Sequence, residues 1–374
     1  MQRKYIEEIK EGEINAIDVY DVTGKILLKK EAEIKSFNLE KLKLYGIPFI
    51  YVENNDIFVN YIFEMNLRAE LIKILKCFLE SEGENSAILK RYNIEEIKKF
   101  LIYNNEKGNQ IAYGHIFKYF INEIINCLKN NSKLFYDFID YRSMENYYFY
   151  HSINVACISL LLGYKLNLKN EELIDLGVGA LLYDLKMQLY KFVEQNKTLS
   201  EIEKEEMQQH TYLSFDTVRK IYGITARAAS IAYQHHERFD GSGYPQKLKG
   251  EQISLLSKIV AVADVYDALT SNRPHRKAYL PEDAYNYIKT NSGVLFDPEI
   301  VLMFEKSIAK FLPGDIVLLN DGSKAIVLYN NKEDMTAPVI KIIEKKSTDD
   351  IIADKVDLLK EKKLKIIKTV SSVR

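Results

Sequence analysis

Apolar side chains recur at helical spacing through nearly all of residues 133–310. Gly and Pro, which interrupt or end helices, are confined to a few places there, among them Gly177, Gly179, Gly223 and the cluster at 241–245. A helix with one apolar stripe must bury that stripe against another element. Several such segments in succession therefore predict a mainly α core built as a helical bundle.

The segments on either side of this core have a different texture. Residues 14–30 alternate apolar and polar around a turn at 21–24, which predicts a hairpin. A helix-spaced stretch closed by Gly46 then precedes another short strand, and two alternating runs around 320–322 predict a second hairpin. We therefore expect a small α+β accessory module at residues 1–60, a helical connector at 61–130, the helical domain at 131–311 and a β-rich appendage at 312–374.

Charge and cysteine content limit the partners and the compartment. The chain has 52 Lys+Arg against 53 Asp+Glu, so its net charge gives no reason to expect DNA, RNA or an anionic membrane as a partner. Three cysteines without a CxxC pair suit a reducing compartment. The charged N-terminus does not resemble a secretory signal, and the apolar runs are too short to span a membrane. We predict a cytoplasmic protein without membrane insertion.

Two carboxylates stand in unfavourable surroundings. Asp184 and Asp264 lie in the apolar helical runs LLYDL and VAVADVYDAL. A buried carboxylate is costly unless it is paired or bound to a metal, and imidazole together with carboxylate suits divalent first-row metals. Neighbouring His235 and His236 would project about 100° apart on a helix, which suits the edge of a site that holds two ions. Each residue alone fits an ordinary buried side chain, but their combination predicts an interior cation site.

Several short motifs follow one another through the helical segment. In chain order they are His151-Ser152, Asp184 in its apolar run, His210, His235-His236-Glu237, Asp240-Gly241-Ser242-Gly243-Tyr244-Pro245, Ala263-Asp264, Asp267-Ala268-Leu269-Thr270-Ser271 and Arg273-Pro274. This order resembles the HD-GYP domain, a branch of the HD phosphohydrolases whose members hydrolyse cyclic di-GMP. The resemblance covers roughly residues 138–311, and its HHExxDGSGYP string is specific.

The resemblance implies a metal-dependent phosphodiesterase. Such an enzyme uses a metal-activated hydroxide to open cyclic di-GMP to pGpG, with further conversion to GMP left open. Two divalent ions are expected, Fe or Mn above all. By resemblance, His151 and Asp264 hold the first ion, Asp184 bridges, and the second ion is held by His210, His235 and His236.

The resemblance also assigns the contacts with the nucleotide. Arg273 and Arg276 would clamp phosphate or the guanine edge, because a planar guanidinium fork suits both. The alternative for these arginines is a solvated helix end paired with Asp267. The loop residues that would meet the nucleotide are Gly241, Gly243 and Tyr244.

The chain departs from the family pattern at the signature pair, where Tyr183-Asp184 replaces His-Asp. This weakens the first metal position, because a phenol binds divalent metals poorly unless it ionises. Met187 stands where the family has a lysine. Lys186 lies one residue earlier and is, with Asp184, the candidate catalytic group, although a shift of one residue rotates a helical side chain by about 100°.

Three functions remain open at this point. The first is slow hydrolysis of cyclic di-GMP, since loss of a proton donor costs roughly 10²- to 10⁴-fold in rate. The second is a catalytically impaired receptor or interaction module that binds cyclic di-GMP, and the third is hydrolysis of another phosphate ester. A homodimer is compatible with the helical connector, but apolar helix faces serve an internal core equally well.

Overall fold

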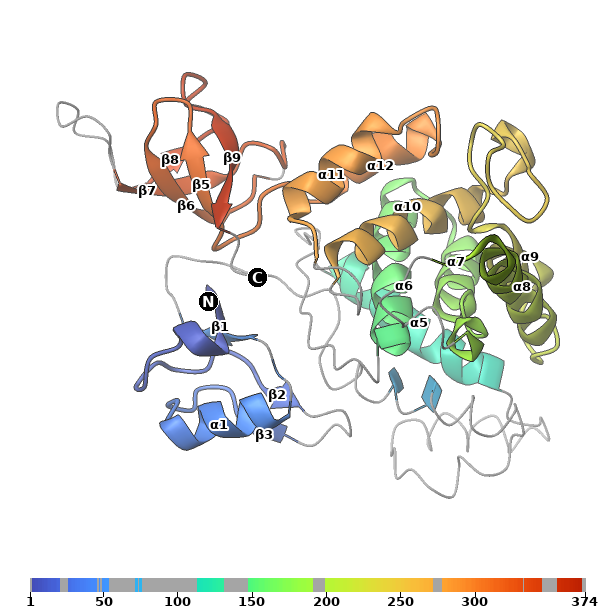
Figure 1. The fold of residues 1–374 in the computed structure, drawn as a ribbon, viewed down its shortest axis with the longest axis horizontal. Helices are drawn as coiled ribbons and strands as arrows, with labels where there is room; N and C mark the ends of the chain where they lie inside the picture. The colour runs from blue at the N-terminus through green and yellow to red at the C-terminus, as the bar shows by residue number, and fades with distance from the viewer. Residues whose placement is uncertain are drawn as a thin grey trace.

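A computed structural model describes most of the chain (Figure 1). The longest part that it does not describe lies between residues 53 and 113. The described residues are 2–20, 26–45, 47, 49–53, 71–72, 74–75, 113–130, 147–190, 199–271, 278–331, 333–344 and 355–371.

The N-terminal module combines short strands with one helix. Strand β1 (Gln2–Tyr5) pairs antiparallel with β4 (Phe49–Val52), and β2 (Val19–Tyr20) pairs antiparallel with β3 (Ile26–Leu28). A 3₁₀ turn (Ile6–Glu8) and helix α1 (Ser36–Leu44) complete it. The β2–β3 pair confirms the strands of the predicted hairpin, whose turn lies outside the described residues.

The helical body contains eight described α-helices. They are α5 (Tyr113–Asn130), α6 (Tyr147–Lys165), α7 (Asn170–Leu182), α8 (Glu201–Val218), α9 (Ala226–Gln234), α10 (Leu255–Thr270), α11 (Pro281–Thr290) and α12 (Pro298–Ser307), with 3₁₀ turns η3 (Met187–Leu189) and η5 (Gly250–Gln252). Helix α6 packs against α7 and α10, and α9 packs against α7 and α8. The mainly α prediction is confirmed. Helix α5 also packs on α6 and α7, although the proposed connector includes it.

Helix starts follow ordinary capping chemistry. A side-chain oxygen at the N-cap accepts a hydrogen bond from a backbone N–H of the first turn, which satisfies a donor that the helix itself leaves open. Such caps begin helices α8, α9, α10 and α12. The residues are Ser200, Thr225, Ser254 and Asp297.

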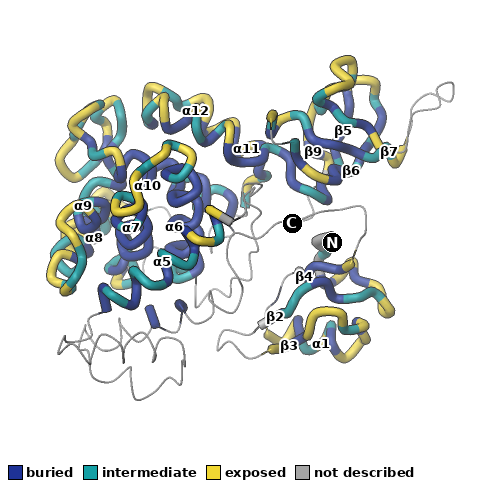
Figure 2. Tube along the Cα trace, turned by 180° about the vertical axis from the view of Figure 1, so that it is seen from behind, coloured by how far each residue is buried: buried dark blue, intermediate teal, exposed yellow. Residues whose placement is uncertain are grey.

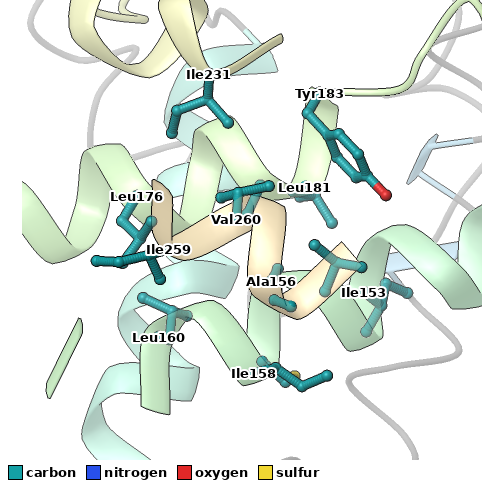
Figure 3. Packing of buried hydrophobic residues seen from close by; sticks show 14 of the residues in the cluster. Ile153, Ala156, Ile158, Leu160, Leu176, Leu181, Tyr183, Ile231, Ile259 and Val260 are labelled. Carbon is teal, nitrogen blue, oxygen red and sulfur yellow. The ribbon is translucent and has the colours of Figure 1, made fainter. Parts of the chain in front are cut away.

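Helices α6, α7 and α10 form the buried centre of the body, dark blue in Figure 2. Aliphatic side chains from these helices and α9 interdigitate there (Figure 3). Gly179 permits the close contact of α7 with α9, because a Cβ at this position would stand 2.6 Å from the backbone oxygen of Ala228. This contact brings the C-terminal end of α7 close to the end of α9, where the candidate site lies.

A five-stranded antiparallel sheet ends the described chain. Its order is β8-β7-β6-β5-β9, and its strands are β5 (Ile316–Leu319), β6 (Lys324–Tyr329), β7 (Val339–Glu344), β8 (Val356–Asp357) and β9 (Ile366–Ser371). The β5–β6 pair confirms the second predicted hairpin. The sheet contacts α11 through Glu282, which accepts a hydrogen bond of 2.8 Å from the backbone N–H of Thr369.

Among the described helices, none combines the length and the apolar character needed to cross a bilayer.

Candidate metal centre and nucleotide loop

The candidate ligands come from five different helices or their ends. His151 lies on α6, His210 on α8 and Asp264 on α10. Asp184 follows the end of α7, and the His235-His236 pair follows the last residue of α9. The packing of α6, α7, α9 and α10 brings these positions together, but the side chains form two distinct groups.

The first group is the histidine triad, made of His210, His235 and His236. One ring nitrogen from each residue lies within 4.8 Å of the others. The Nδ1 atoms of His210 and His235 face the backbone oxygens of Met207 at 2.6 Å and Ala232 at 3.0 Å. Their Nε2 atoms face each other at 3.4 Å. Such backbone contacts orient imidazoles for metal binding, because they fix which nitrogen is left for the ion.

The histidine pair stands at the end of α9. The helix ends at Gln234, and His235 is its C-cap residue, with helical backbone angles of φ −64° and ψ −19°. The centroids of the two imidazole rings lie 4.1 Å apart. Both rings turn toward His210 on α8, at centroid distances of 5.5 and 5.1 Å.

Burial favours the uncharged form of His235 and His236. It lowers the pKa of His235 to about 3, and the neighbouring His210 contributes to the shift. Burial, followed by the effects of His235 and His210, also places the pKa of His236 well below its ordinary value. Neutral imidazole is the form that binds metals, so this site needs no proton release from these two rings at neutral pH.

Asp184 adds a carboxylate to the triad. Its Oδ1 lies 3.4 Å from His210 Nε2, and its side chain is 10% exposed. The sequence pattern predicted Asp184 within a helix. In the structure it stands in the turn that follows α7, because α7 ends at Leu182. Three imidazoles and one carboxylate are a suitable ligand set for a divalent transition metal.

The second group is centred on His151. Its Nδ1 lies 2.6 Å from Asp267 Oδ2, and its Nε2 lies 3.0 Å from Asp264 Oδ1. Asn154 donates a hydrogen bond of 2.9 Å to the other oxygen of Asp267. The sequence analysis gave Asp267 and Asn154 no role at the site. Their spacing was the available signal, because each lies three residues after a candidate ligand on the same helix.

Tyr183 connects the two groups. Its hydroxyl donates to Asp264 Oδ1 at 2.7 Å and lies 2.8 Å from His151 Nε2. Its ring meets His235 edge-on, with centroids 4.6 Å apart. Figure 3 shows Tyr183 beside the aliphatic side chains of the core.

Electrostatic effects support this hydrogen-bonded arrangement. Burial opposes a charge on His151, but the stacked Tyr147 and the hydrogen bonds with Asp264 and Asp267 raise its pKa well above the ordinary value. Burial likewise opposes ionisation of Asp264, and its hydrogen bond with His151 outweighs that effect, so its pKa is well below the usual range. Burial and the adjacent Asp264 raise the pKa of Tyr183, which keeps the phenol protonated.

The two groups differ in how well they fit divalent ions. The triad presents nitrogens that face one another, with the carboxylate of Asp184 beside them, and this arrangement fits one ion. In the second group the hydroxyl of Tyr183 lies within hydrogen-bond distance of both atoms that would bind the first ion. That arrangement does not fit a second ion.

The segment 237–248, called the GYP loop below, folds back over the triad. Glu237, which is 1% exposed, accepts hydrogen bonds from the backbone N–H groups of Gln246 at 2.7 Å and Leu248 at 2.9 Å. The backbone N–H of Tyr244 donates to the oxygen of His236, and the two rings lie 4.7 Å apart. Glu237 is a loop anchor that the sequence analysis named only as part of a motif. Its signal in the sequence was a carboxylate directly after a pair of adjacent histidines.

Glycine is required at two places in this loop. Gly241 has a φ of +86°, in the left-handed region, while at Gly243 a Cβ would come within 2.5 Å of both Glu237 Cα and His236 O. Gly243→Ala should therefore displace the loop and lower the free energy of unfolding by about 1–3 kcal/mol, the usual cost of overpacking. Urea denaturation would check this, with exposed Ser242→Ala as the control. Equal stability of Gly243→Ala and the wild type would contradict it.

The remaining candidates are less informative. Lys186 follows Asp184 in the turn, and its backbone N–H donates to Ser214 Oγ at 3.0 Å. In the described part of the chain, its side chain has no hydrogen bond or ion pair. Arg273 and Arg276 lie outside the described residues, so their predicted contact with substrate stays a prediction.

Known proteins resemble this chain over the helical body. Residues 133–300 match the family model described as HD domain. A cyclic di-GMP phosphodiesterase of Pseudomonas aeruginosa is 30% identical over 203 residues, which are 54% of this chain and 49% of that protein. A cyclic di-GMP phosphodiesterase of Thermotoga maritima is 35% identical over 170 residues, or 45% and 46% of the two chains. These matches confirm the predicted resemblance of the helical domain to the HD-GYP domain.

The relatives of this chain are named for more than one cyclic dinucleotide. A 3′3′-cGAMP-specific phosphodiesterase of Vibrio cholerae is 30% identical over 175 residues, 46% of this chain and 38% of that protein. The chain thus spans about half the length, or less, of the curated relatives that it matches. HD domains are metal-dependent phosphohydrolases, so divalent ions are the expected class of cofactor.

Proposed function

We propose that this HD-GYP protein is a phosphodiesterase that hydrolyses cyclic di-GMP to pGpG with a divalent ion held by the histidine triad and Asp184. The observation that carries the proposal is the convergence of three imidazoles within 4.8 Å beneath the ring of Tyr244. A merely structural role gives no reason to gather three imidazoles in the interior with their nitrogens facing one another.

The reaction adds water across one phosphodiester bond. The water oxygen bonds to phosphorus, the bond from phosphorus to the ribose O3′ breaks, and O3′ leaves with a proton. When bound, a divalent ion lowers the pKa of water and stabilises charge on the phosphate oxygens. Asp184 would orient the attacking water, and Lys186 is the candidate for the proton that goes to O3′.

The GYP loop supplies the nucleotide contacts in this proposal. Gly241 and Gly243 permit a close approach of backbone to ligand, since neither carries a Cβ. Tyr244 presents an aromatic ring beside the metal ligands, and Arg273 with Arg276 would hold phosphate or guanine. Fe or Mn is the proposed metal.

Cyclic di-GMP is preferred over other cyclic dinucleotides because two of the relatives compared above are named for it. The relative named for 3′3′-cGAMP makes that compound the first competitor to test. A cytoplasmic location and a homodimer remain part of the proposal, and cell fractionation and light scattering test them.

The decisive assay incubates Mn²⁺-loaded protein with cyclic di-GMP and follows pGpG and GMP by chromatography. Asp184→Asn should lower turnover by about 10²-fold or more, because it removes a charged ligand and water-orienting group. Asp216→Asn is the matched control, since Asp216 pairs with Arg219 and Lys220 on the outer surface of α8.

Each outcome of this assay decides between the functions. Turnover that Asp184→Asn leaves unchanged would refute the proposed site. Binding of cyclic di-GMP without pGpG formation would favour the receptor function. Faster hydrolysis of 3′3′-cGAMP than of cyclic di-GMP would move the proposal to the other substrate.

A further inference from the structure

We propose that the hydroxyl of Tyr183 takes the place of the first metal ion, so that this chain holds one ion at the triad where the family pattern implies two. The inference rests on the proposed function only in assigning the triad to a metal. It concerns the number of ions and the role of Tyr183.

The first argument is the position of the hydroxyl. The resemblance assigns His151 and Asp264 to the first ion, and Tyr183 Oη lies 2.8 Å from His151 Nε2 and 2.7 Å from Asp264 Oδ1. The two atoms are also 3.0 Å from each other. The three polar atoms thus form a closed set of hydrogen bonds that needs no ion.

An ion at the first position would also lack space. Zinc-like ions bind nitrogen and carboxylate oxygen at about 2.0–2.2 Å. An ion at that distance from His151 Nε2 and Asp264 Oδ1, on the side that faces Tyr183, would overlap the hydroxyl oxygen. The ring of Tyr183 would have to move, yet it is fully buried and packs against His235. Protein interiors are close-packed, so moving a buried ring requires its neighbours to move as well.

The third argument is the support beneath His151. Asp267 holds the other ring nitrogen of His151 at 2.6 Å, and Asn154 holds Asp267. The imidazole is thereby fixed with Nε2 toward Tyr183 and Asp264. The polar side chains around His151 therefore find their hydrogen-bond partners in one another.

The fourth argument is that the triad does not depend on Tyr183 for its ligands. His210, His235 and His236 are oriented separately, and Asp184 lies beside His210. The aromatic ring stands between this cluster and His151, touching both. The hydroxyl of Tyr183 thus fills the first ion position, while the ion position at the triad stays complete.

The test counts metal. The full chain is loaded with Mn²⁺, freed of excess ion by gel filtration, and its manganese is measured by elemental analysis. The wild type should hold about one ion per chain and Tyr183→His about two, because the imidazole restores a ligand and removes the hydroxyl. Tyr287→His, at an exposed position of α11, is the control and should stay at one.

A second pair of variants keeps the test decisive if Tyr183→His does not fold. His151→Gln and His210→Gln remove equally buried imidazoles from the two groups. His151→Gln should keep the ion, and His210→Gln should lose it. Loss of metal in both variants, or in His151→Gln alone, would overturn the inference.

Two further results would overturn it directly. One is a wild-type content of two manganese ions per chain. The other is a visible absorption band in ferric protein that Tyr183→Phe abolishes, since such a band would identify Tyr183 as a phenolate ligand. Neither result depends on turnover. A protein with one ion and no hydrolysis would refute the proposed function alone, and hydrolysis with two ions would refute this inference alone.

Discussion

His235→Gln is expected to abolish metal binding and to lower hydrolysis of cyclic di-GMP by at least about 10³-fold, because a bound ion supplies several kcal/mol of transition-state stabilisation. His235 is fully buried, and its Nε2 lies 3.4 Å from that of His210. Glutamine occupies similar space but offers an amide in place of the ligating nitrogen. Elemental analysis and chromatographic detection of pGpG measure the two effects.

His115→Gln is the control for this substitution. His115 lies on α5 beside Tyr222, with ring centroids 6.0 Å apart, and it belongs to neither group of the site. Its replacement should leave metal content and turnover at wild-type values. Full metal content in His235→Gln would show that the triad is not the binding site.

Asp267→Ala is expected to lower the free energy of unfolding by about 3 kcal/mol or more, as loss of one partner in a buried ion pair does. Asp267 is fully buried and is shared by His151 and Asn154. Alanine leaves both of those polar groups buried without this acceptor. Urea denaturation followed by circular dichroism measures the change.

Asp216→Ala provides the comparison for stability. Like Asp267, Asp216 has two side-chain partners, but these are Arg219 and Lys220 on the solvent side of α8. Exposed ion pairs contribute little, so this variant should unfold at nearly the wild-type urea concentration. Equal destabilisation by both substitutions would mean that the burial of Asp267 does not determine its contribution to the free energy of unfolding.

Periodicity and turn residues were sufficient for the outline of the fold. The helical spacing predicted the bundle, and the Asn320-Asp321-Gly322 turn predicted the β5–β6 hairpin. These features depend on neighbours in the sequence, and the relevant physical rules are local. The packing of α5 onto α6 and α7 was not apparent, because an apolar helix face does not identify its partner.

The candidate site was predictable in its residue types and less so in its geometry. The cost of a buried carboxylate pointed to Asp184 and Asp264, and the family motif pointed to the histidines. The hydrogen bond of Asp267 with His151 was missed because it joins two helices far apart in the sequence. The anchoring of the loop by Glu237 was missed because it depends on how the loop folds back on its own first residues.

The helical class, the ligand chemistry and the presence of tyrosine at position 183 follow from the order of the amino acids. The role of that tyrosine depends on how the helices pack. The close packing of α7 with α6, α9 and α10 directs its hydroxyl to His151 and Asp264 and its ring to His235. A side chain's chemistry is fixed by its atoms, but the groups that it meets are set by the helices packed around it.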